Sequence, residues 1–599
     1  MSLVVQKFGG TSVSSADRIR RAAERAVAAK QAGHQVVVVV SAQGKKTDEL
    51  IRLAAEITSS PRPREMDMLL ATGEQESVAL MAMAVHELGE EAISLTGAQI
   101  GVLTDETHTR ARIVRISTDR IKQALDAGQI VVAAGFQGVD ANSDITTLGR
   151  GGSDTTAAAL AAVLSADRCD IYTDVEGVFT TDPRVVQDAT RIESVSCDEM
   201  LELASMGAGV MHSRSIEFAR KYGVLLRVGP SYSDGPGTMI TPVAGHVTRV
   251  VTGVAFVRNE ARVGLADIPD RPGVMDNLFS RLSLAKIPVD MVVQNVADGG
   301  AASLSFTVAE DDLEAAVDVA EETVRLLGSG YVEHHVQLSK VSIVGHGMQT
   351  HTGVAAQMFQ VFADRKINIE MVTTSEIKIS VLIHRDACED AVRAVHKGFG
   401  LNTAAPSQPS IGVAAGNTPS SRMREQPKDD DIVQRLSGME DIVVSSVYAD
   451  TEQARITIDN LPDDPGIAAR VFTLVGQDGV LVDMIIQNAG RRGTASISFT
   501  VPMSDADRTT KLLSESFGWD SDASISCEAR VGKLSVSGIG LRSHTDVAAR
   551  MFRILAEEKI NVQLVNTSEI KVSVLITPDE AQRACEALRR EFQLDNTAE

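Results

Sequence analysis

The chain has 599 residues, of which 44% are hydrophobic and 23% charged, and its formal net charge is −22. Single hydrophobic cores rarely grow past roughly 250–300 residues, so several domains are expected, and the negative charge argues against binding to nucleic acid or to an anionic membrane. The sequence contains no run of about 18 apolar residues, so no membrane span is predicted, and its first residues lack a signal-peptide pattern. The five scattered cysteines are typical of a reducing compartment. We therefore expect a cytoplasmic protein.

Residues 1–245 alternate between predicted strands and predicted helices. Short apolar runs predict buried strands at 3–8, 35–40, 130–134 and 169–172. The run at 35–40 is almost pure valine, which is typical of a parallel strand covered on both faces. Helices are expected between the strands, including one long helix from Met66 to Leu88. This alternation predicts an α/β domain of three αβα layers with a mostly parallel sheet.

Polar and glycine residues follow several of these strands. In open α/β sheets, ligands bind outside the carboxyl ends of the strands. The residues at those ends are Lys7, Ser41, Gly135 to Gly138, Thr173 and Asp174. Their convergence predicts one ligand site at this edge of the sheet.

The segment from Thr147 to Asp154 reads Thr-Leu-Gly-Arg-Gly-Gly-Ser-Asp and opens an alanine-rich helix. Its glycines let the backbone approach a ligand, and the N-terminus of the helix favours an anion. Arg150 adds a forked cation that suits a carboxylate or a phosphate, whereas Asp154 would repel a phosphate unless a metal or a lysine balanced it. The mixture indicates phosphate chemistry on a carboxylate substrate. An ordinary glycine-rich loop before a helix is the alternative.

Three further positions have both a functional and an ordinary interpretation. Lys7 precedes Gly9 and Gly10, and it could neutralise a transferred phosphate or be a solvated lysine beside a tight turn. Glu74, in an apolar helix, could hold a substrate ammonium or be a surface acid. Arg184 could reach a nucleotide phosphate or belong to a plain turn. The glycine-rich segment elsewhere in the chain favours the functional interpretation of Lys7.

The second half of the chain is repetitive. Residues 367–383 recur as residues 560–576, at an offset of 193 positions and with 12 of 17 residues identical. Each copy is itself double at a spacing of 80 positions, and each unit reads strand, turn, helix, strand, strand, helix, strand. We therefore expect four units and one linker rich in Pro, Ser, Ala and Gly. The units are placed at 253–339, 340–402, 446–532 and 533–599, and the linker at 403–431.

Three motifs resemble those of the aspartate kinases, within the amino acid kinase superfamily. They are Lys7-Phe-Gly-Gly-Thr-Ser12, Thr147-Leu-Gly-Arg-Gly-Gly-Ser-Asp154, and Tyr172-Thr-Asp174 with Thr181-Asp-Pro-Arg184. The four units resemble ACT domains, small ferredoxin-like βαββαβ modules that bind amino acids. The resemblance covers nearly the whole chain outside the linker. It implies that MgATP phosphorylates the β-carboxylate of L-aspartate to give 4-phospho-L-aspartate, the first step toward lysine, threonine and methionine.

The resemblance also implies a role for each matching residue. In the catalytic centre, Lys7 would stabilise the transferring phosphoryl group and Asp154 would orient Lys7. The aspartate site would consist of Ser41, Thr47, Glu74, Arg150, Gly151 and Ser153. Arg150 would bind the α-carboxylate and Glu74 the α-ammonium. ATP, carrying Mg²⁺, would be held by Lys7, Gly9, Gly10, Thr173, Asp174 and Arg184. A carboxylate nucleophile is already ionised at neutral pH, so no general base is needed.

Two positions depart from the family pattern. Many relatives have a lysine near the position of Gly209 that reaches ATP, and many have a tyrosine at the position of Phe179. Here residues 206–212 contain no lysine, and position 179 is phenylalanine. The finer nucleotide contacts are therefore not predicted.

The ACT resemblance implies effector sites where paired modules meet, at the turn before each first helix. In the first pair the candidates are Asp270, Gly273, Val274 and Asn295 of the first module, with Gln349, Thr352, Val354, Thr374 and Ser375 of the second. In the duplicate they are Asp463, Gly466, Ile467, Asn488, Thr545, Val547, Thr567 and Ser568. We expect feedback inhibition by lysine, threonine or both, and a homodimer formed by exposed module edges. A purely structural second pair is the alternative.

Two other functions fit parts of the sequence. Another amino acid or nucleotide kinase of the superfamily would share the first domain, but the ACT modules and the lysine-led first motif argue against it. A non-catalytic amino acid sensor would require a damaged active site. The expected catalytic and substrate residues are all present: Lys7, Glu74, Arg150 and Asp154.

Overall fold

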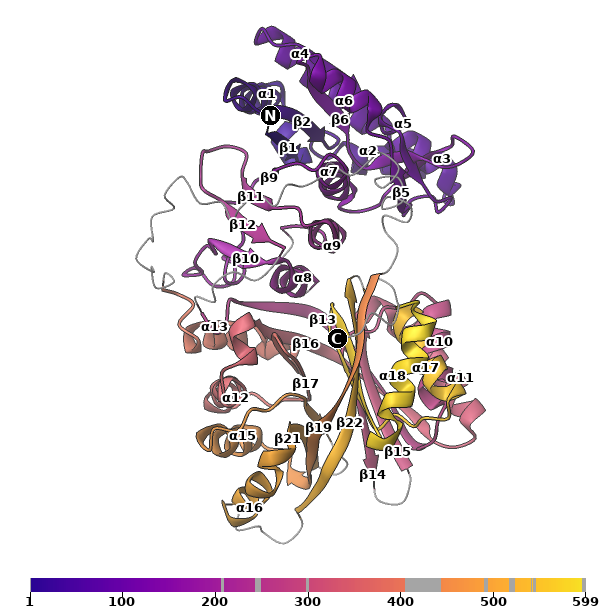
Figure 1. Cartoon of the computed structure of the whole chain (residues 1–599), viewed down its shortest axis with the longest axis vertical. Coiled ribbons are helices and arrows are strands. Elements are labelled where there is room, and N and C mark those ends of the chain that lie inside the picture. The colour runs from indigo at the N-terminus through magenta and orange to yellow at the C-terminus, as the bar shows by residue number, and fades with distance from the viewer. Residues whose placement is uncertain are drawn as a thin grey trace.

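The computed structural model describes residues 2–205, 210–242, 249–297, 301–403, 443–489, 494–516, 523–539, 541 and 546–594. Figure 1 shows an N-terminal domain, coloured indigo to magenta, above a repeat region coloured pink to yellow. Nearly all of the predicted linker lies outside the described residues, and so does Gly209.

The N-terminal domain is built on an eight-stranded sheet. Its order is β10 (Ser194–Ser196), β12 (Thr238–Thr241), β11 (Leu226–Pro230), β9 (Arg168–Thr173), β1 (Leu3–Phe8), β2 (Gln35–Val40), β6 (Ile130–Ala134) and β3 (Ala92–Leu95). Neighbouring strands are parallel except β11 and β12. In β2, Val37 and Val39 enter the hydrophobic cluster on one face, and Val36, Val38 and Val40 enter that on the other. The predicted α/β domain with a mostly parallel sheet is confirmed.

Helices cover both faces of this sheet. One face is covered by α1 (Ala16–Gln31) and α4 (Thr72–Glu87). The other is covered by α5 (Gly97–Ile100), α6 (Asp119–Asp126), α7 (Gly152–Val163), α8 (Cys197–Ser205) and α9 (Ser213–Tyr222). A smaller sheet has the order β5 (Ile113–Ile116), β4 (Val102–Thr104), β7 (Gln137–Val139) and β8 (Ile145–Thr147). Two more helices, α2 (Lys46–Ile57) and α3 (Pro63–Leu70), lie between β2 and α4 in the chain.

The long helix predicted over residues 66–88 is two helices, α3 and α4, separated by Ala71. The hydroxyl of Thr72 donates to the carbonyl of Leu69 (2.7 Å), and the side-chain amide of Gln137 donates to the carbonyl of Ala71 (2.9 Å). The carbonyl of Ala71 thus shares its helical hydrogen bond from the N–H of Gln75, which is long at 3.4 Å, with the side chain of Gln137. The prediction was wrong here because apolar periodicity does not reveal such hydrogen bonds.

The repeat region contains a twelve-stranded antiparallel sheet. Its order is β14 (Val292–Ala297), β15 (Ala301–Ala309), β13 (Gly253–Pro269), β16 (Tyr331–Val344), β18 (Lys378–His384), β17 (Met371–Ser375), β20 (Ile485–Ala489), β21 (Thr494–Pro502), β19 (Val443–Pro462), β22 (Ser524–Ile539), β24 (Lys571–Ile576) and β23 (Leu564–Thr567). One group of helices comprises α12 (Val354–Asp364), α13 (Cys388–Gly398), α15 (Ile467–Gln477) and α16 (Ala506–Ser516). The other comprises α10 (Val274–Leu284), α11 (Leu313–Leu327), α17 (Asp546–Glu557) and α18 (Ala581–Glu591). In Figure 1 the two groups lie on opposite sides of the strands.

The longest strands of the repeat region serve two units at once. The first part of β13, Gly253–Val257, pairs with Lys340–Val344 of β16, whereas Arg262–Ala266 pairs with Tyr331–His335. The second unit therefore takes one strand from the residues that begin the first unit. Strands β19 and β22 repeat this arrangement in the second half.

The units pair across the repeat rather than in sequence order. Helix α12 lies beside α15 and strand β17 pairs with β20, so the second unit meets the third. Helix α10 lies beside α17, so the first unit meets the fourth. We expected the first unit to pair with the second, and the structure corrects this because the free edges of β17 and β20 meet within one chain. Those edges were our reason to expect a homodimer, which stays a prediction.

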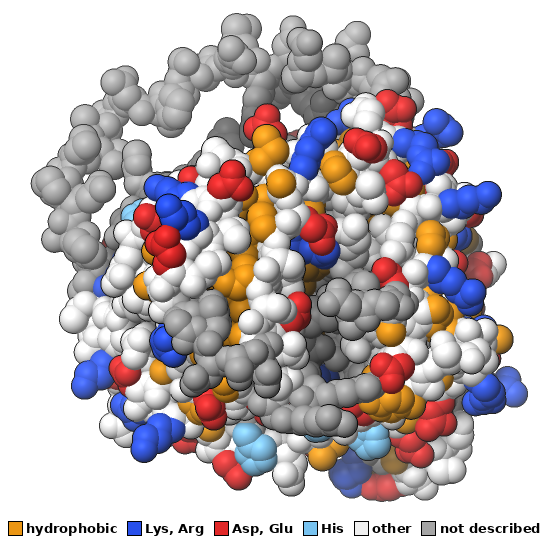
Figure 2. Space-filling model, turned by 90° about the horizontal axis from the view of Figure 1, so that it is seen from below, with side chains coloured by type: hydrophobic (Ala, Val, Ile, Leu, Met, Phe, Trp, Pro, Cys, Tyr) orange, Lys and Arg blue, Asp and Glu red, His pale blue; other side chains and the backbone are white. Residues whose placement is uncertain are grey.

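The end of the repeat region farthest from the N-terminal domain carries charges of both signs. In Figure 2, acidic and basic side chains are interspersed with hydrophobic ones over this face. Among the described residues, no helix combines the length and apolar character that crossing a membrane requires.

Candidate active site

A cavity of about 980 Å³ opens in the N-terminal domain where β1, β2 and β6 reach their carboxyl ends. Nine residues predicted from the sequence line it: Lys7, Gly10, Ser41, Thr47, Glu74, Arg150, Gly151, Ser153 and Asp154. Parallel strands bring these residues together because their carboxyl ends share one edge of the sheet.

Lys7 and Asp154 form a nearly buried ion pair in this cavity. The Nζ atom of Lys7 lies 2.5 Å from Oδ1 of Asp154, and the two side chains are 10% and 12% exposed. Lys7 comes from β1, and Asp154 lies in the first turn of α7, where the helix dipole favours an acid. The pair places a cation beside the start of a helix, an arrangement that can neutralise a phosphoryl group.

The backbone at the start of α7 depends on glycine. Gly151 precedes the helix with a φ of 72°, and a Cβ atom at this position would lie 2.2 Å from the Cβ of His212. No other residue combines this left-handed conformation with so little space. The first turn of α7 therefore lines the cavity with Ser153 and Asp154, and N–H groups at such a helix start have no partner within the helix.

Arg150 lies at the opening of the cavity. Its side chain is exposed and makes no hydrogen bond or ion pair with the residues that the structure describes. The guanidinium is therefore available for a planar anion such as a carboxylate.

Glu74 is a buried acid with one satisfied oxygen. Its Oε1 accepts a hydrogen bond from the backbone N–H of Ala42 (2.9 Å), while Oε2 is buried without a hydrogen-bond partner among the described residues. Burial raises the pKa of Glu74 to about 7. An ammonium group at Oε2 would supply the missing partner and lower that pKa.

Four residues predicted to bind nucleotide do not line the cavity: Gly9, Thr173, Asp174 and Arg184. Gly9 and Thr173 lie at neighbouring strand ends because β1 pairs with β9. Arg184 is separate from them, since its side chain is 87% exposed and pairs with Asp182 at 2.7 Å. That guanidinium lowers the pKa of Asp182.

The cavity also contains residues that the sequence did not single out. They are Lys45, Arg110, Arg112, Phe136, His212, Arg214 and Lys221. Arg214 donates to the carbonyls of Leu148 and Ala111, so it supports the glycine-rich segment from behind. Burial and the charge of Arg214 lower the pKa of His212. Only Phe136 had a sequence signal, its position at a strand end; the other residues approach from distant segments.

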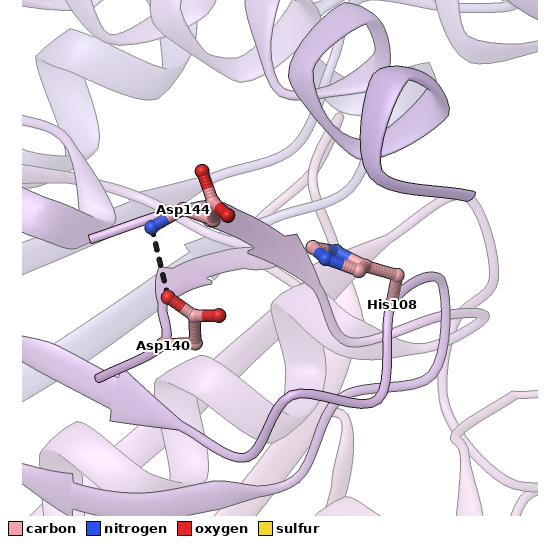
Figure 3. A group of neighbouring side chains, drawn as sticks. All are labelled: His108, Asp140 and Asp144. Carbon is pink, nitrogen blue, oxygen red and sulfur yellow. Dashed lines mark hydrogen bonds between the residues drawn. The ribbon is translucent and has the colours of Figure 1, made fainter. Parts of the chain in front are cut away.

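One group of possible metal ligands is present in the part of the chain that the structure describes. His108, Asp140 and Asp144 face one another beside the β7–β8 hairpin (Figure 3), outside the cavity. Asp144 pairs there with Arg64 at 2.6 Å, and the charge of Arg64 opposes a cation. Mg²⁺ is usually held by substrate phosphates together with one or two carboxylates from the protein. Asp154 in the cavity could supply one such carboxylate.

A small cavity of about 50 Å³ lies between the second and third units of the repeat region. The effector candidates that line it are Thr352, Val354, Thr374 and Ser375. The third unit contributes Asp483, whose backbone carbonyl accepts a hydrogen bond from the hydroxyl of Thr374 (3.0 Å). Gln349 lies outside this lining and donates to Glu376 (3.2 Å).

An equivalent cavity of about 50 Å³ lies between the first and fourth units. Thr567 and Ser568 line it, and the hydroxyl of Thr567 donates to the backbone carbonyl of Asp290 (2.6 Å). A third, smaller cavity at this interface is lined by the candidates Asp270, Gly273 and Val274.

Four of the remaining effector candidates also lie at these two interfaces. Asp463 accepts a hydrogen bond from Asn368 of the second unit (3.4 Å), and Gly466 and Ile467 begin α15. Val547 is buried at the start of α17. Thr545 and the side chains of Asn295 and Asn488 lie outside what the structure describes.

Comparison with known proteins adds two family matches. The model described as "Amino acid kinase family" matches residues 2–229. The model described as "ACT domain" matches residues 265–324, 341–399, 458–517 and 534–592.

Individual relatives agree with these matches. An aspartate kinase of Pseudomonas putida is 49% identical over 407 residues, which cover 68% of this chain and 99% of that protein. The crystal structure of aspartate kinase from Synechocystis covers 100% of this chain and 99% of its own, with 40% identity and a TM-score of 0.52.

Escherichia coli aspartokinase III is similar over two thirds of the chain. Its R-state complex with aspartate and ADP shares 25% identity, covers 67% of this chain and 100% of its own, and gives a TM-score of 0.57. Its T-state complex with lysine and aspartate shares 26% identity, covers 66% of this chain and 99% of its own, and gives 0.51.

Proposed function

Because this chain belongs to the aspartate kinases of the amino acid kinase family and carries four ACT domains, we propose that the cavity around Lys7 is where L-aspartate receives the γ-phosphoryl group of MgATP. One observation carries the proposal. The buried Lys7–Asp154 pair, the half-satisfied Glu74 and the unpartnered Arg150 all line the same cavity.

Two charged residues of the cavity suit the two ends of an amino acid. Arg150 offers two parallel N–H groups to the α-carboxylate, and the free Oε2 of Glu74 accepts the α-ammonium. Ser41, Thr47 and Ser153, which carry hydroxyl groups, line the same cavity. Binding both ends fixes the direction of the β-carboxylate, so that it faces Lys7.

Phosphoryl transfer needs positioning and neutralisation of charge rather than covalent help from the protein. The β-carboxylate is ionised at neutral pH and attacks without a general base. Lys7 and the N–H groups at the start of α7 meet the negative charge of the transferring group, while Asp154 orients Lys7. Mg²⁺, bound with the nucleotide, would add positive charge between the phosphates.

The nucleotide would lie toward the carboxyl end of β9. Thr173 and Asp174 follow that strand, next to the strand that carries Lys7. E. coli aspartokinase III has been solved with ADP and aspartate together, which supports adjacent sites in this chain. Arg184 would have to leave Asp182 to reach a phosphate.

We further propose that lysine, threonine or both inhibit the enzyme at the two unit interfaces. The structure of E. coli aspartokinase III with lysine supports this class of effector. Each interface places an acidic turn residue, Asp270 or Asp463, next to a partner unit, and an acid can hold the ammonium of an effector.

The route from these interfaces to the kinase domain would pass through α8. Glu202 of α8 pairs with Lys378 of the second unit at 2.9 Å, and its Oε1 accepts the backbone N–H of Glu569 in the fourth unit (3.1 Å). One side chain of the kinase domain thus touches both even-numbered units. An effector that shifts these units against each other would therefore displace α8.

The proposal is tested by aspartate-dependent release of ADP from MgATP, with lysine and threonine added singly and together. Glu74→Gln should raise the KM for aspartate by about 10–100-fold, the effect expected when a charge-assisted hydrogen bond is lost. Glu76→Gln is the matched control, because Glu76 lies on the same helix and pairs with Lys46 at the surface. No ADP release under any condition would leave only an amino acid sensor.

A further inference from the structure

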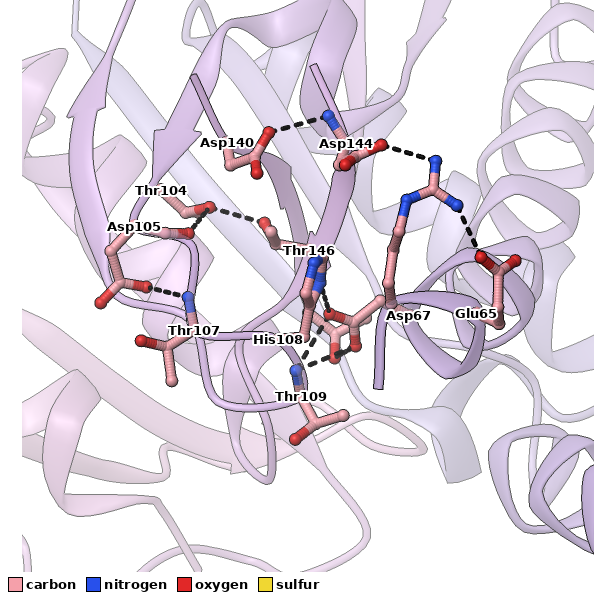
Figure 4. A network of polar contacts seen from close by, with 12 residues as sticks. Glu65, Asp67, Thr104, Asp105, Thr107, His108, Thr109, Asp140, Asp144 and Thr146 are labelled. Atoms are coloured by element: carbon pink, nitrogen blue, oxygen red, sulfur yellow. Dashed lines mark hydrogen bonds and ion pairs between the residues drawn. The ribbon is translucent and has the colours of Figure 1, made fainter. Parts of the chain in front are cut away.

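Asp67 is a buried acid that has no role in the reaction described above. It belongs to α3, its side chain is 0% exposed, and it does not line the cavity. Its carboxylate accepts hydrogen bonds from Nδ1 of His108 (2.8 Å), the backbone N–H of Thr109 (2.9 Å) and the hydroxyl of Thr147 (2.5 Å). Figure 4 shows the contacts to His108 and Thr109. A carboxylate buried this deeply needs such a set of donors.

The segments that Asp67 holds form one wall of the cavity. Thr109 and Thr147 both line it. Thr147 is the last residue of β8, and three residues later, after Leu148 and Gly149, the chain reaches Arg150. The two segments also bind each other, since the N–H of Ala111 donates to the carbonyl of Thr147 (2.9 Å). Asp67 therefore fixes the backbone from which Arg150 projects.

Thr109 has a backbone conformation that is strained for a β-branched residue. Its φ is 68°, in the left-handed region. Its N–H donates to both carboxylate oxygens of Asp67, at 3.1 and 2.9 Å. Its carbonyl lies against Gly149, where a Cβ atom would be only 3.1 Å away. The strain is thus located where the wall meets the glycine-rich segment, and Asp67 is the group that holds it.

We propose that Asp67 is a positioning residue for aspartate binding. By binding Thr109 and Thr147 together, it sets the segment 147–150 so that Arg150 meets the α-carboxylate of aspartate. The inference rests on the proposed role of Arg150, and Asp67 itself touches neither substrate.

The first test replaces Asp67 by alanine and measures KM for each substrate separately. Asp67→Ala should raise the KM for aspartate by about tenfold or more, because three donors lose their acceptor and the wall relaxes. The KM for ATP should stay within about twofold, since most predicted nucleotide residues follow β1 and β9, and Asp67 hydrogen-bonds to neither strand. A general loss of stability would affect the KM for aspartate and the KM for ATP alike.

Asp144→Ala is the matched control. Asp144 links the same two elements, because it precedes β8 and pairs with Arg64 of α3, but it contacts neither Thr109 nor Thr147. This variant should leave both KM values unchanged. An equal rise of the KM for aspartate in Asp144→Ala and Asp67→Ala would overturn the proposal.

Two rescues make the test specific. Asp67→Asn keeps an acceptor for the N–H of Thr109 and should recover part of the lost affinity. Thr109→Gly in the Asp67→Ala background should also recover part of it, since glycine adopts a φ of 68° without support. Failure of both rescues, in variants that melt cooperatively, would contradict the positioning role.

If Asp67→Ala does not fold, Thr147→Val answers the question alone. Valine keeps the shape of threonine and removes only the hydroxyl that binds Asp67, so a severalfold rise of the KM for aspartate is expected. An unchanged KM would overturn the inference. Arg150→Ala separates this result from the proposed function: if that variant also leaves the KM unchanged, the assignment of Arg150 is at fault rather than that of Asp67.

Discussion

The two interfaces between ACT units use the same contacts although they join different parts of the chain. Thr374 donates to the carbonyl of Asp483 between the second and third units, and Thr567 donates to that of Asp290 between the fourth and first. Thr567 follows Thr374 by 193 positions and Asp483 follows Asp290 by the same number, the offset of the sequence repeat. The tandem duplication therefore produced two copies of one interface inside a single chain.

Buried side chains repeat in the same way. The ring centroids of Phe359 and Phe472 lie 5.3 Å apart, and those of Phe552 and Phe279 lie 4.8 Å apart. Aromatic pairs at these separations stabilise both helix contacts in the same manner.

The interfaces differ in the partners of two equivalent lysines, Lys378 of the second unit and Lys571 of the fourth. Lys571 pairs with Glu376, whose side chain is 41% exposed. The equivalent Lys378 pairs instead with Glu202 of the kinase domain, and the two side chains are 4% and 0% exposed. A surface ion pair in one copy has thus become a buried contact between domains in the other.

A second substitution accompanies this change. Position 448 is tyrosine, and its hydroxyl contacts Lys571. The equivalent position 255 is alanine, which packs into the hydrophobic cluster of the kinase domain beside α8. The smaller residue leaves room for that helix. The two copies of the duplicated repeat therefore differ at the surface that contacts the kinase domain.

The largest expected difference comes from removing the two acids that face these lysines. Glu202→Ala leaves Lys378 buried without its ion-pair partner, which should cost about 3–5 kcal/mol of unfolding free energy. Glu376→Ala removes a partly exposed partner and should cost about 0–1 kcal/mol. Chemical denaturation of both variants measures the difference. Equal losses of unfolding free energy in the two variants would show that the two ion pairs do not differ in burial as described.

The pH dependence of kcat/KM for aspartate should be the same in Glu202→Ala and Glu376→Ala. The ammonium of aspartate needs the ionised form of Glu74, whose pKa is about 7 because of burial. Below pH 7 the group is protonated, so kcat/KM for aspartate should fall about tenfold per pH unit, and above pH 7 it should be level. Glu74→Gln should lose this inflection. A pH profile that changes only in Glu202→Ala would show that the contact between Glu202 and Lys378 affects the environment of Glu74.

The smallest effect tests how similar the two interfaces are. Thr567→Val removes one hydrogen bond between units and should cost about 0.5–1.5 kcal/mol of unfolding free energy. Thr374→Val removes two, because its hydroxyl also accepts a hydrogen bond from the backbone N–H of Ile485 (2.8 Å), so it should cost about twice as much. Thermal unfolding of both variants measures the difference, and equal losses would contradict it.

Much of the catalytic domain could be predicted from the sequence. The valine run of β2 indicates a strand buried on both faces, and parallel strand ends must converge, which is why Lys7 and Ser41 could be expected near one another. The match to the aspartate kinases confirms the family. These features depend on local patterns that each segment carries by itself.

Other features depend on contacts between distant segments and have no local pattern. Gln294 binds the carbonyl of Val562, 268 positions away, and such contacts decide which units pair. Asp67 occurs in an ordinary polar helix, and only the fold shows that its side chain is buried. Arg184 is part of a family motif, yet in this structure it turns to Asp182.

The most direct test asks whether effector binding at the ACT units inhibits the kinase domain through α8. It measures the inhibition of ADP release by lysine and threonine in Glu202→Gln and in Glu376→Gln. The wild type and Glu376→Gln should both be inhibited, while Glu202→Gln should keep its uninhibited rate and lose most of the inhibition. Inhibition of Glu202→Gln equal to that of the wild type would contradict the account.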